Sequence, residues 1–123
     1  MKTLEHDEQS ALFQWAALQE NQIPALQHLF EIPNGGHRHK AVAVKLQQEG
    51  VKAGVPDIFL AFPYGGFHGL FIEMKAGSNT TTERQDEWIG KLLNVGYMTA
   101  VCYSFETAKQ EILDYLGIVD ADL

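Results

Sequence analysis

The sequence predicts an α/β fold in which a mixed sheet of about four strands is flanked by helices. Helical and strand patterns alternate in the order αβαββαβα, the two central strands are nearly continuous in apolar residues, and glycine or proline turns separate the elements. Such apolar strands are typical of a sheet that is covered on both faces. The chain has 123 residues, so we expect residues 1–123 to form one domain, with a core at about 5–117 and tails at 1–4 and 118–123.

The first half of the chain predicts two helices with a short strand between them. Leu12 and Ala16 lie four residues apart on one apolar stripe, and Pro24 ends the helix that carries them. The second helix stops at Gly50, a residue type that often ends helices. The expected elements are a helix over about 8–21, a strand over 28–32, a turn over 33–36 and a helix over 40–49.

The second half predicts a hairpin, a helix, a further strand and a final helix. Thr82 and Gln85 have the spacing of a capping box, which marks the start of a helix, and Gly117 ends the last helix. Glycine and proline residues supply the turn between the hairpin strands. The expected elements are strands over 57–62 and 69–75, a turn over 63–68, a helix over 82–94, a strand over 97–103 and a helix over about 105–116.

Three charged residues stand at the ends of the two hydrophobic hairpin strands. In an antiparallel pair folded about Gly65, Asp57 and Glu73 are each eight positions from the turn centre, so they lie opposite each other on one face. Lys75, two residues further along, shares that face. Two carboxylates about 5 Å apart repel by roughly 3 kcal/mol at an effective dielectric constant near 20. A hard divalent cation between them is the natural way to remove this cost.

Glu8 occupies an unusual position for an acidic residue. It precedes Leu12 by four residues and Trp15 by seven, which places its carboxylate on the inward stripe of the first helix. It either contributes to a site there or is a solvated residue of the first turn, where negative charge suits the helix dipole.

The composition excludes several classes of protein. No stretch approaches the roughly 18 apolar residues of a membrane span, and the first residues lack the apolar core of a signal peptide. We therefore expect an intracellular protein with no membrane partner. The single cysteine, Cys102, excludes an intrachain disulfide and a multi-cysteine zinc site. Its apolar neighbours favour a buried and inert thiol.

Charge is unevenly distributed along the chain, whose formal net charge is −7. Between residues 32 and 56 the charged side chains are mostly basic, with Glu49 as the one acidic residue. This segment is either a solvated helix face or a surface that contacts phosphates. The basic residues concerned are Arg38, Lys40, Lys45 and Lys52.

Two short motifs in this element order resemble those of the PD-(D/E)xK nuclease superfamily. These are Pro56-Asp57 and Glu73-Met74-Lys75. Three further features narrow the resemblance to the VRR-NUC domain in its short, stand-alone phage or bacterial form. They are Gly54-Val55 before the first motif, Glu8-Gln9 upstream and Gln85 after the lysine. The resemblance covers nearly the whole chain and implies a restriction-endonuclease-like core.

The resemblance also implies roles for individual residues. Asp57, Glu73 and the backbone carbonyl of Met74 would bind Mg2+, or Mn2+ in its place, and Glu8 would complete the metal site. The side chain of Met74 would point the other way, into the core. Lys75 would orient the attacking water and stabilise charge on the phosphate. For Gln85 two roles stay open, a contact with the lysine or a phosphate and plain capping of its helix.

The implied activity is hydrolysis of phosphodiester bonds in structured or branched DNA during repair, recombination or phage replication. Resolution of four-way Holliday-type junctions would require two active sites and hence a homodimer. Arg38, Lys40, Lys45 and Lys52 are the expected phosphate contacts. The expected location is the cytoplasm of a bacterium, whether the protein comes from the host or from a phage.

Two alternatives of other classes stay open at this point. One is a non-catalytic module that binds DNA or assembles on it with the same fold. The other is a zinc enzyme that uses His37, His39 and His68, although no further cysteine or histidine signature completes such a site.

Overall fold

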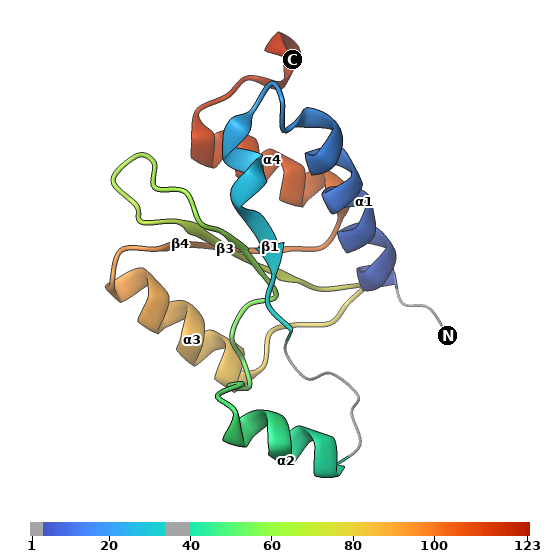
Figure 1. Cartoon of the computed structure of the whole chain (residues 1–123), viewed down its shortest axis with the longest axis vertical. Helices are drawn as coiled ribbons and strands as arrows, with labels where there is room; N and C mark the ends of the chain where they lie inside the picture. Colours follow the sequence, from blue (N-terminus) through green and yellow to red (C-terminus); the bar gives the residue numbers. More distant parts are fainter. Residues whose placement is uncertain (1–3, 34–39) are drawn as a thin grey trace.

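The computed structural model describes residues 4–33 and 40–123, and these form a four-stranded mixed sheet with helices on both faces (Figure 1). The strand order is β1-β2-β3-β4, with antiparallel pairing from β1 to β3 and parallel pairing between β3 and β4. The predicted α/β class with a mixed sheet is confirmed. The helices are α1 (Leu4–Gln19), α2 (Lys40–Gln48), α3 (Glu83–Asn94) and α4 (Phe105–Leu116), and the strands are β1 (Leu29–Glu31), β2 (Ile58–Leu60), β3 (Leu70–Met74) and β4 (Met98–Cys102).

The hairpin of β2 and β3 has the register that the sequence predicts. Ile58 pairs with Ile72 and Leu60 with Leu70, so one further step along the ladder sets Asp57 opposite Glu73. Both strands are shorter than predicted, and β2 covers only three residues.

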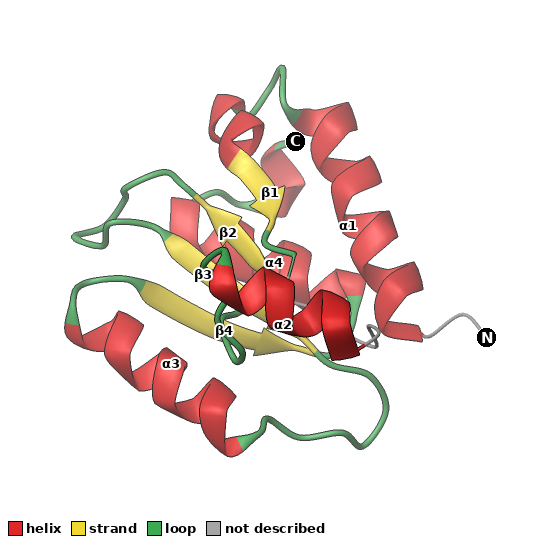
Figure 2. Ribbon diagram, turned by 60° about the horizontal axis from the view of Figure 1, so that its bottom comes forward, coloured by secondary structure: helices red, strands yellow, loops and turns green. Residues whose placement is uncertain are grey.

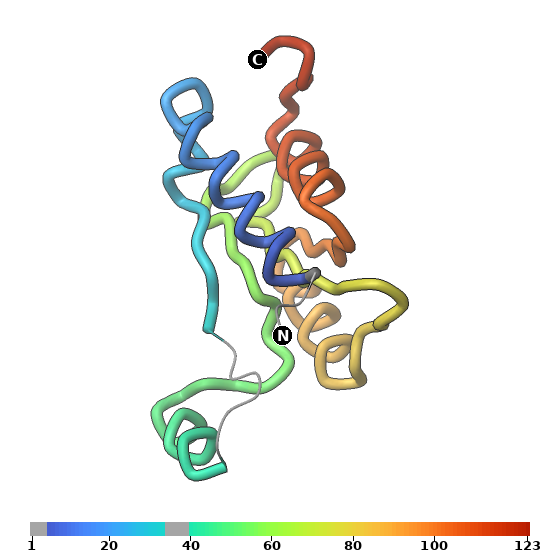
Figure 3. Tube along the Cα trace, turned by 90° about the vertical axis from the view of Figure 1, so that its right-hand side faces the viewer, coloured from blue at the N-terminus to red at the C-terminus, as the bar shows by residue number. Residues whose placement is uncertain are grey.

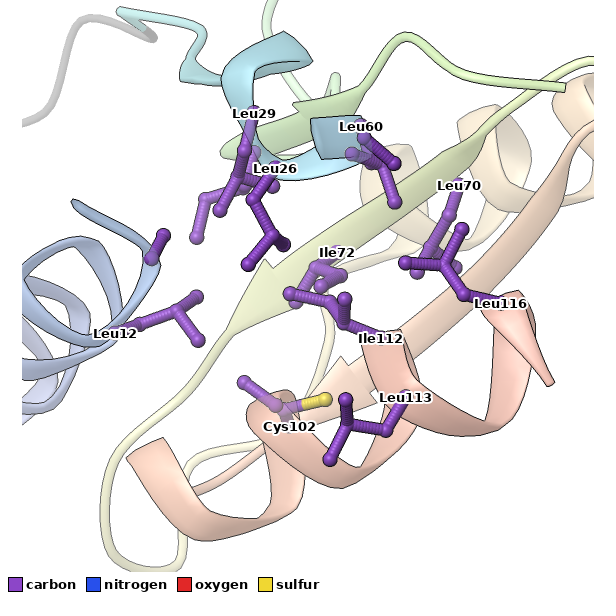
Figure 4. Packing of buried hydrophobic residues seen from close by; sticks show 14 of the residues in the cluster. Leu12, Leu26, Leu29, Leu60, Leu70, Ile72, Cys102, Ile112, Leu113 and Leu116 are labelled. Carbon is purple, nitrogen blue, oxygen red and sulfur yellow. The ribbon is translucent and has the colours of Figure 1, made fainter. Parts of the chain in front are cut away.

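The core lies between the sheet and the pair of helices α1 and α4 (Figures 2 and 4). Alternate residues of the strands point into it, as the two-residue period of a strand requires. In the centre, Ile72 of β3 meets Leu12 of α1 and Ile112 of α4, and all three are fully buried. The predicted apolar stripe of the first helix, with Leu12 and Ala16 buried, is confirmed.

The opposite face of the sheet is covered by α3, which connects the parallel strands β3 and β4, as a parallel pair needs a crossover. Helix α2 lies at the lower end of the molecule in Figure 1, and the segment that follows it packs on the first turn of α3. None of the residues of α2, all of which are described, is buried. Helix α2 therefore contributes nothing to the hydrophobic core.

The N-terminal elements differ from the prediction in two respects. The first helix begins at Leu4 instead of near Glu8, so one more turn of helix lies at the edge of the sheet. Pro24 does not simply end that helix, because it opens a short 3-10 helix, Pro24–His28, in which proline occupies the first turn. A second 3-10 turn, Asp120–Asp122, lies in the segment expected to be a tail.

Candidate active site

The two carboxyl groups that the sequence predicts to be neighbours lie together at one end of the hairpin. The backbone N–H of Met74 donates a hydrogen bond of 3.0 Å to Asp57 Oδ2, which holds the Asp57 side chain against the end of β3. The carboxyl groups of Asp57 and Glu73 lie next to each other there. The side chain of Met74 is fully buried in the core, as expected from the resemblance.

Glu73 is the buried charged residue of the described chain, with 3% of its surface exposed. Burial raises the pKa of its carboxyl to about 9, and the nearby carboxylate of Asp57 adds to the shift, while Lys75 opposes it. Burial likewise raises the pKa of Asp57, against the effect of the Met74 N–H. Without a bound cation the pair therefore keeps one proton, since two neighbouring buried carboxyl groups do not both ionise.

One oxygen of Glu73 is engaged by two side chains, and the other is not. Gln85 Nε2 donates to Glu73 Oε2 at 3.3 Å, and Lys75 Nζ lies 3.9 Å from the same oxygen. Oε1 is buried and has no hydrogen-bond partner among the described residues. A buried acceptor without a partner carries a desolvation cost of about 1–3 kcal/mol, so the arrangement favours a ligand at Oε1.

Of the two roles that the sequence left open for Gln85, the structure shows the capping of its helix, together with a contact to Glu73 that was not predicted. The backbone N–H of Gln85 donates to Thr82 Oγ1 and its Oε1 accepts from the Thr82 N–H, so the predicted capping box is confirmed. The same side chain uses its amide nitrogen to contact Glu73. The start of α3 is thereby fixed to the carboxyl pair.

Glu8 contacts a different partner from the one expected. Its Oε1 accepts a hydrogen bond of 2.8 Å from the backbone N–H of Phe105, at the start of α4. Ser104 and Thr107 form a capping box at the same helix end, so Glu8 satisfies a further backbone donor there. The inward direction predicted for Glu8 therefore has a structural explanation, and the described contacts of its carboxylate do not include Asp57 or Glu73.

Glu5, which the sequence reasoning missed, is the acidic residue of α1 that faces the pair. Burial is the main cause that raises the pKa of its carboxyl, the Asp57 carboxylate raises this pKa further, and Lys75 opposes the shift. Figures 1 and 3 place the start of α1 beside the segment that follows β3. Residues 5, 8 and 12 lie on one helical stripe. A helix that begins at Leu4 therefore predicts the same inward direction for Glu5 as for Glu8.

We expect Glu5→Gln and Glu8→Gln to separate the two roles. Loss of the Glu5 charge should lower DNA cleavage about tenfold or more, with little change in stability, because Glu5 acts on the carboxyl pair. Loss of the Glu8 charge should lower the free energy of unfolding by about 1 kcal/mol, as for other helix caps, with cleavage per folded molecule unchanged. Single-turnover cleavage and thermal unfolding of both variants provide the check. The reverse pattern would restore Glu8 as the third carboxylate of the site.

The donor set fits a hard divalent cation in part. Two carboxyl groups in contact, one with a partnerless oxygen, are the oxygen ligands that Mg2+ prefers. Within residues 4–33 and 40–123, however, no three His, Cys, Asp or Glu side chains form a ready metal cluster. A third ligand would have to come from Glu5, from the Met74 carbonyl, from water or from the substrate.

Comparison with known proteins agrees with this geometry. The sequence profile of the VRR-NUC domain matches residues 1–106. The chain belongs to the VRR-NUC family. A solved structure titled "VRR_NUC domain protein" superposes with a TM-score of 0.78 and 27% sequence identity, over 98% of this chain and 93% of that one. The comparison with curated proteins gave no match.

The VRR-NUC match includes all of the residues that form the site. It extends from the N-terminal helix through Asp57, Glu73, Lys75 and Gln85, and it ends at the start of α4. VRR-NUC domains form a family of nucleases, so membership supports nuclease chemistry at the carboxyl pair.

Several other predicted residues lie away from the site or outside the described chain. Arg38, His37 and His39 fall in residues 34–39, which are not described. His68 precedes β3, whereas Lys75 follows it, so this histidine and the carboxyl pair lie at opposite ends of the strand. Cys102 is buried, and burial raises the pKa of its thiol to about 12, as an inert cysteine requires. In the described segments no helix is both long and apolar enough to cross a bilayer.

Proposed function

We propose that this VRR-NUC protein is a metal-dependent endonuclease that hydrolyses phosphodiester bonds in structured or branched DNA. The observation that supports it most is the carboxyl pair of Asp57 and Glu73, with Lys75 beside it and one buried carboxylate oxygen without a partner. Such a pair is costly to build unless a cation and a phosphate complete it.

The protein groups would divide the chemistry among them. Asp57, Glu73 and the Met74 carbonyl would hold Mg2+ or Mn2+, with Glu5 as the third carboxylate from α1 and Glu8 as the alternative to it. Bound there, the cation would lower the pKa of a water molecule and neutralise charge on the phosphate. Lys75 would stabilise the phosphate charge and help to orient the water, because its ammonium lies 3.9 Å from Glu73. Gln85 would keep Glu73 in place.

Binding of the DNA backbone would use the basic residues near α2. Lys40 and Lys45 lie on this exposed helix, and Lys52 follows it. Arg38 would add to them from the segment that is not described. Contacts of this kind neutralise phosphates without reading bases, so recognition would depend on DNA shape. A homodimer would supply the second active site needed to cut both strands of a four-way junction.

A cleavage panel tests the proposal. We expect nicked, flapped, forked or four-way DNA to be cut when Mg2+ or Mn2+ is present, no cutting in chelator, and a loss of about a hundredfold or more in Lys75→Ala. Sedimentation with four-way DNA, run in parallel, reports whether a dimer forms. DNA binding without cleavage in any metal would support a non-catalytic module, and activity restored by Zn2+ alone would support the zinc enzyme. Equal activity of the native protein and Lys75→Ala would show that another site cuts the DNA.

A further inference from the structure

A groove of about 520 Å3 runs between α3 and the segment that links α2 to β2. One wall is a stripe of α3 formed by Arg84, Glu87, Trp88 and Lys91, which have the spacing of residues on one helix face. The other wall includes Lys52, from the loop after α2. Ligand pockets for small organic molecules have volumes of about 300–1,000 Å3, so the groove has room for a nucleotide.

The groove is basic although the whole chain carries a net charge of −7. Lys52, Arg84 and Lys91 line it against the single carboxylate of Glu87. Within residues 4–33 and 40–123, no ion pair neutralises Lys52, Arg84 or Lys91. A local positive charge on an acidic protein favours an anionic ligand at that place.

Trp88 gives the groove an aromatic surface. Its ring is half-buried, and Lys91 Nζ lies 5.0 Å from the ring centroid. An indole next to lysine and arginine side chains is the combination with which proteins bind unpaired nucleotides, because the base stacks on the ring while the cations contact the phosphates. A fully paired duplex would offer no free base to this ring.

Both walls of the groove continue into the carboxyl site. Arg84 directly precedes Gln85, whose amide contacts Glu73. The opposite wall leads to Asp57 through Gly54, which has φ +93° and lies so close to α3 that a Cβ atom would come within 2.8 Å of the Arg84 backbone. The loop and the first turn of α3 are therefore packed together, so the groove and the carboxyl pair are carried by the same two segments of the chain.

We propose that this groove binds an unpaired nucleotide of the DNA strand that flanks the cutting site, with its base stacked on Trp88 and its phosphates near Lys52, Arg84 and Lys91. The inference rests on the proposed nuclease function and adds a preference for DNA with a single-stranded segment next to the cut. Helix α3 would then have two roles, because its first turn contacts Glu73 and its next two turns bind the DNA strand.

Tryptophan fluorescence in chelator tests binding separately from cleavage. In a Trp15→Phe background Trp88 is the remaining tryptophan, so its emission reports the groove alone. We expect quenching by a duplex with a single-stranded overhang and little change with a blunt duplex of the same sequence. Unchanged Trp88 emission at saturating overhang DNA would overturn the proposal.

Two variants and a matched control measure the contribution of the groove. We expect Trp88→Leu to weaken binding of overhang DNA about tenfold or more and to leave blunt duplex binding unchanged. Lys91→Gln, at an exposed position, should reduce the salt dependence of binding by about one phosphate contact. Lys109→Gln on α4 is the control, because it removes the same charge. Lys109 also lies over an indole, with its Nζ 6.0 Å from the ring centroid of Trp15.

The outcomes separate this inference from the nuclease proposal. If the native protein cuts DNA and the Trp88 and Lys91 variants bind overhang DNA as tightly as the Lys109 control, the groove proposal is wrong and the nuclease proposal stands. If no metal supports cutting but overhang DNA quenches Trp88 and the variants weaken its binding, the groove is supported and the nuclease proposal fails.

Discussion

Cleavage of DNA by the Glu73→Gln variant is expected to be about a thousandfold slower than by the native protein. Glutamine preserves the size of the side chain but removes the charge that would bind a cation at the buried oxygen Oε1. It also removes the carboxyl that Lys75 and Gln85 contact. The single-turnover rate on labelled DNA, at saturating protein and Mg2+, is the measurement, because it reports chemistry without product release.

A control with the same change of charge is Glu106→Gln, since Glu106 is exposed on α4, which lies in the layer of α1 and not in the layer of α3. We expect this control to cut DNA at the native rate. Thermal unfolding of both variants shows whether they are folded, so that a loss of activity is not a loss of structure. Cleavage by Glu73→Gln within a few fold of the native rate would contradict the assignment of the site.

The second large effect is on the pH dependence of stability. The pKa of Glu73 is raised from 4.5 to about 9 in the folded protein, so between these pH values the native state keeps a proton that the unfolded chain has lost. The free energy of unfolding therefore falls as pH rises through this window, by at most about 1.4 kcal/mol per pH unit. For a domain of this size, 1 kcal/mol corresponds to roughly 4 °C in melting temperature.

A divalent cation that binds the ionised pair should reverse this trend. A cation that binds only the folded state raises the free energy of unfolding. This stabilisation grows with pH because the cation replaces the proton of the carboxyl pair. We expect Mg2+ or Mn2+ to raise the melting temperature more at pH 8 than at pH 6, and Glu73→Gln to lose both the metal-free decline and the metal effect. The difference between native and variant curves isolates Glu73, because other titrating groups are common to both. Equal metal stabilisation of native protein and variant would place the cation elsewhere.

Glu73 and Asp57 illustrate what could be predicted from sequence. Their opposition follows from the two-residue period of a strand and from the position of the turn, which are local properties. The observed pairing of Ile58 with Ile72 has the predicted register. The capping box of Thr82 and Gln85 is local in the same sense, and it was found for the same reason.

Glu5 and Glu8 illustrate what could not be predicted. They lie one turn apart on the same helical stripe, so helical periodicity gives them the same direction. Glu8 contacts the N-terminus of α4, while the charge of Asp57 acts on Glu5, and which acid faces which group depends on how α1 lies across the sheet. The groove of Lys52, Arg84 and Trp88 has the same origin, since its walls are more than 30 residues apart in the chain.

The sequence by itself determined the order of the elements, the register of the central hairpin and the motif that places this chain in the VRR-NUC family. These features depend on periodicity and turn chemistry over short distances along the chain. Only the tertiary structure decided which carboxylate of α1 faces the pair, the capping contact of Glu8 and the basic groove beside α3. Each of these results from the packing of elements distant in sequence, which side-chain volume and burial determine together.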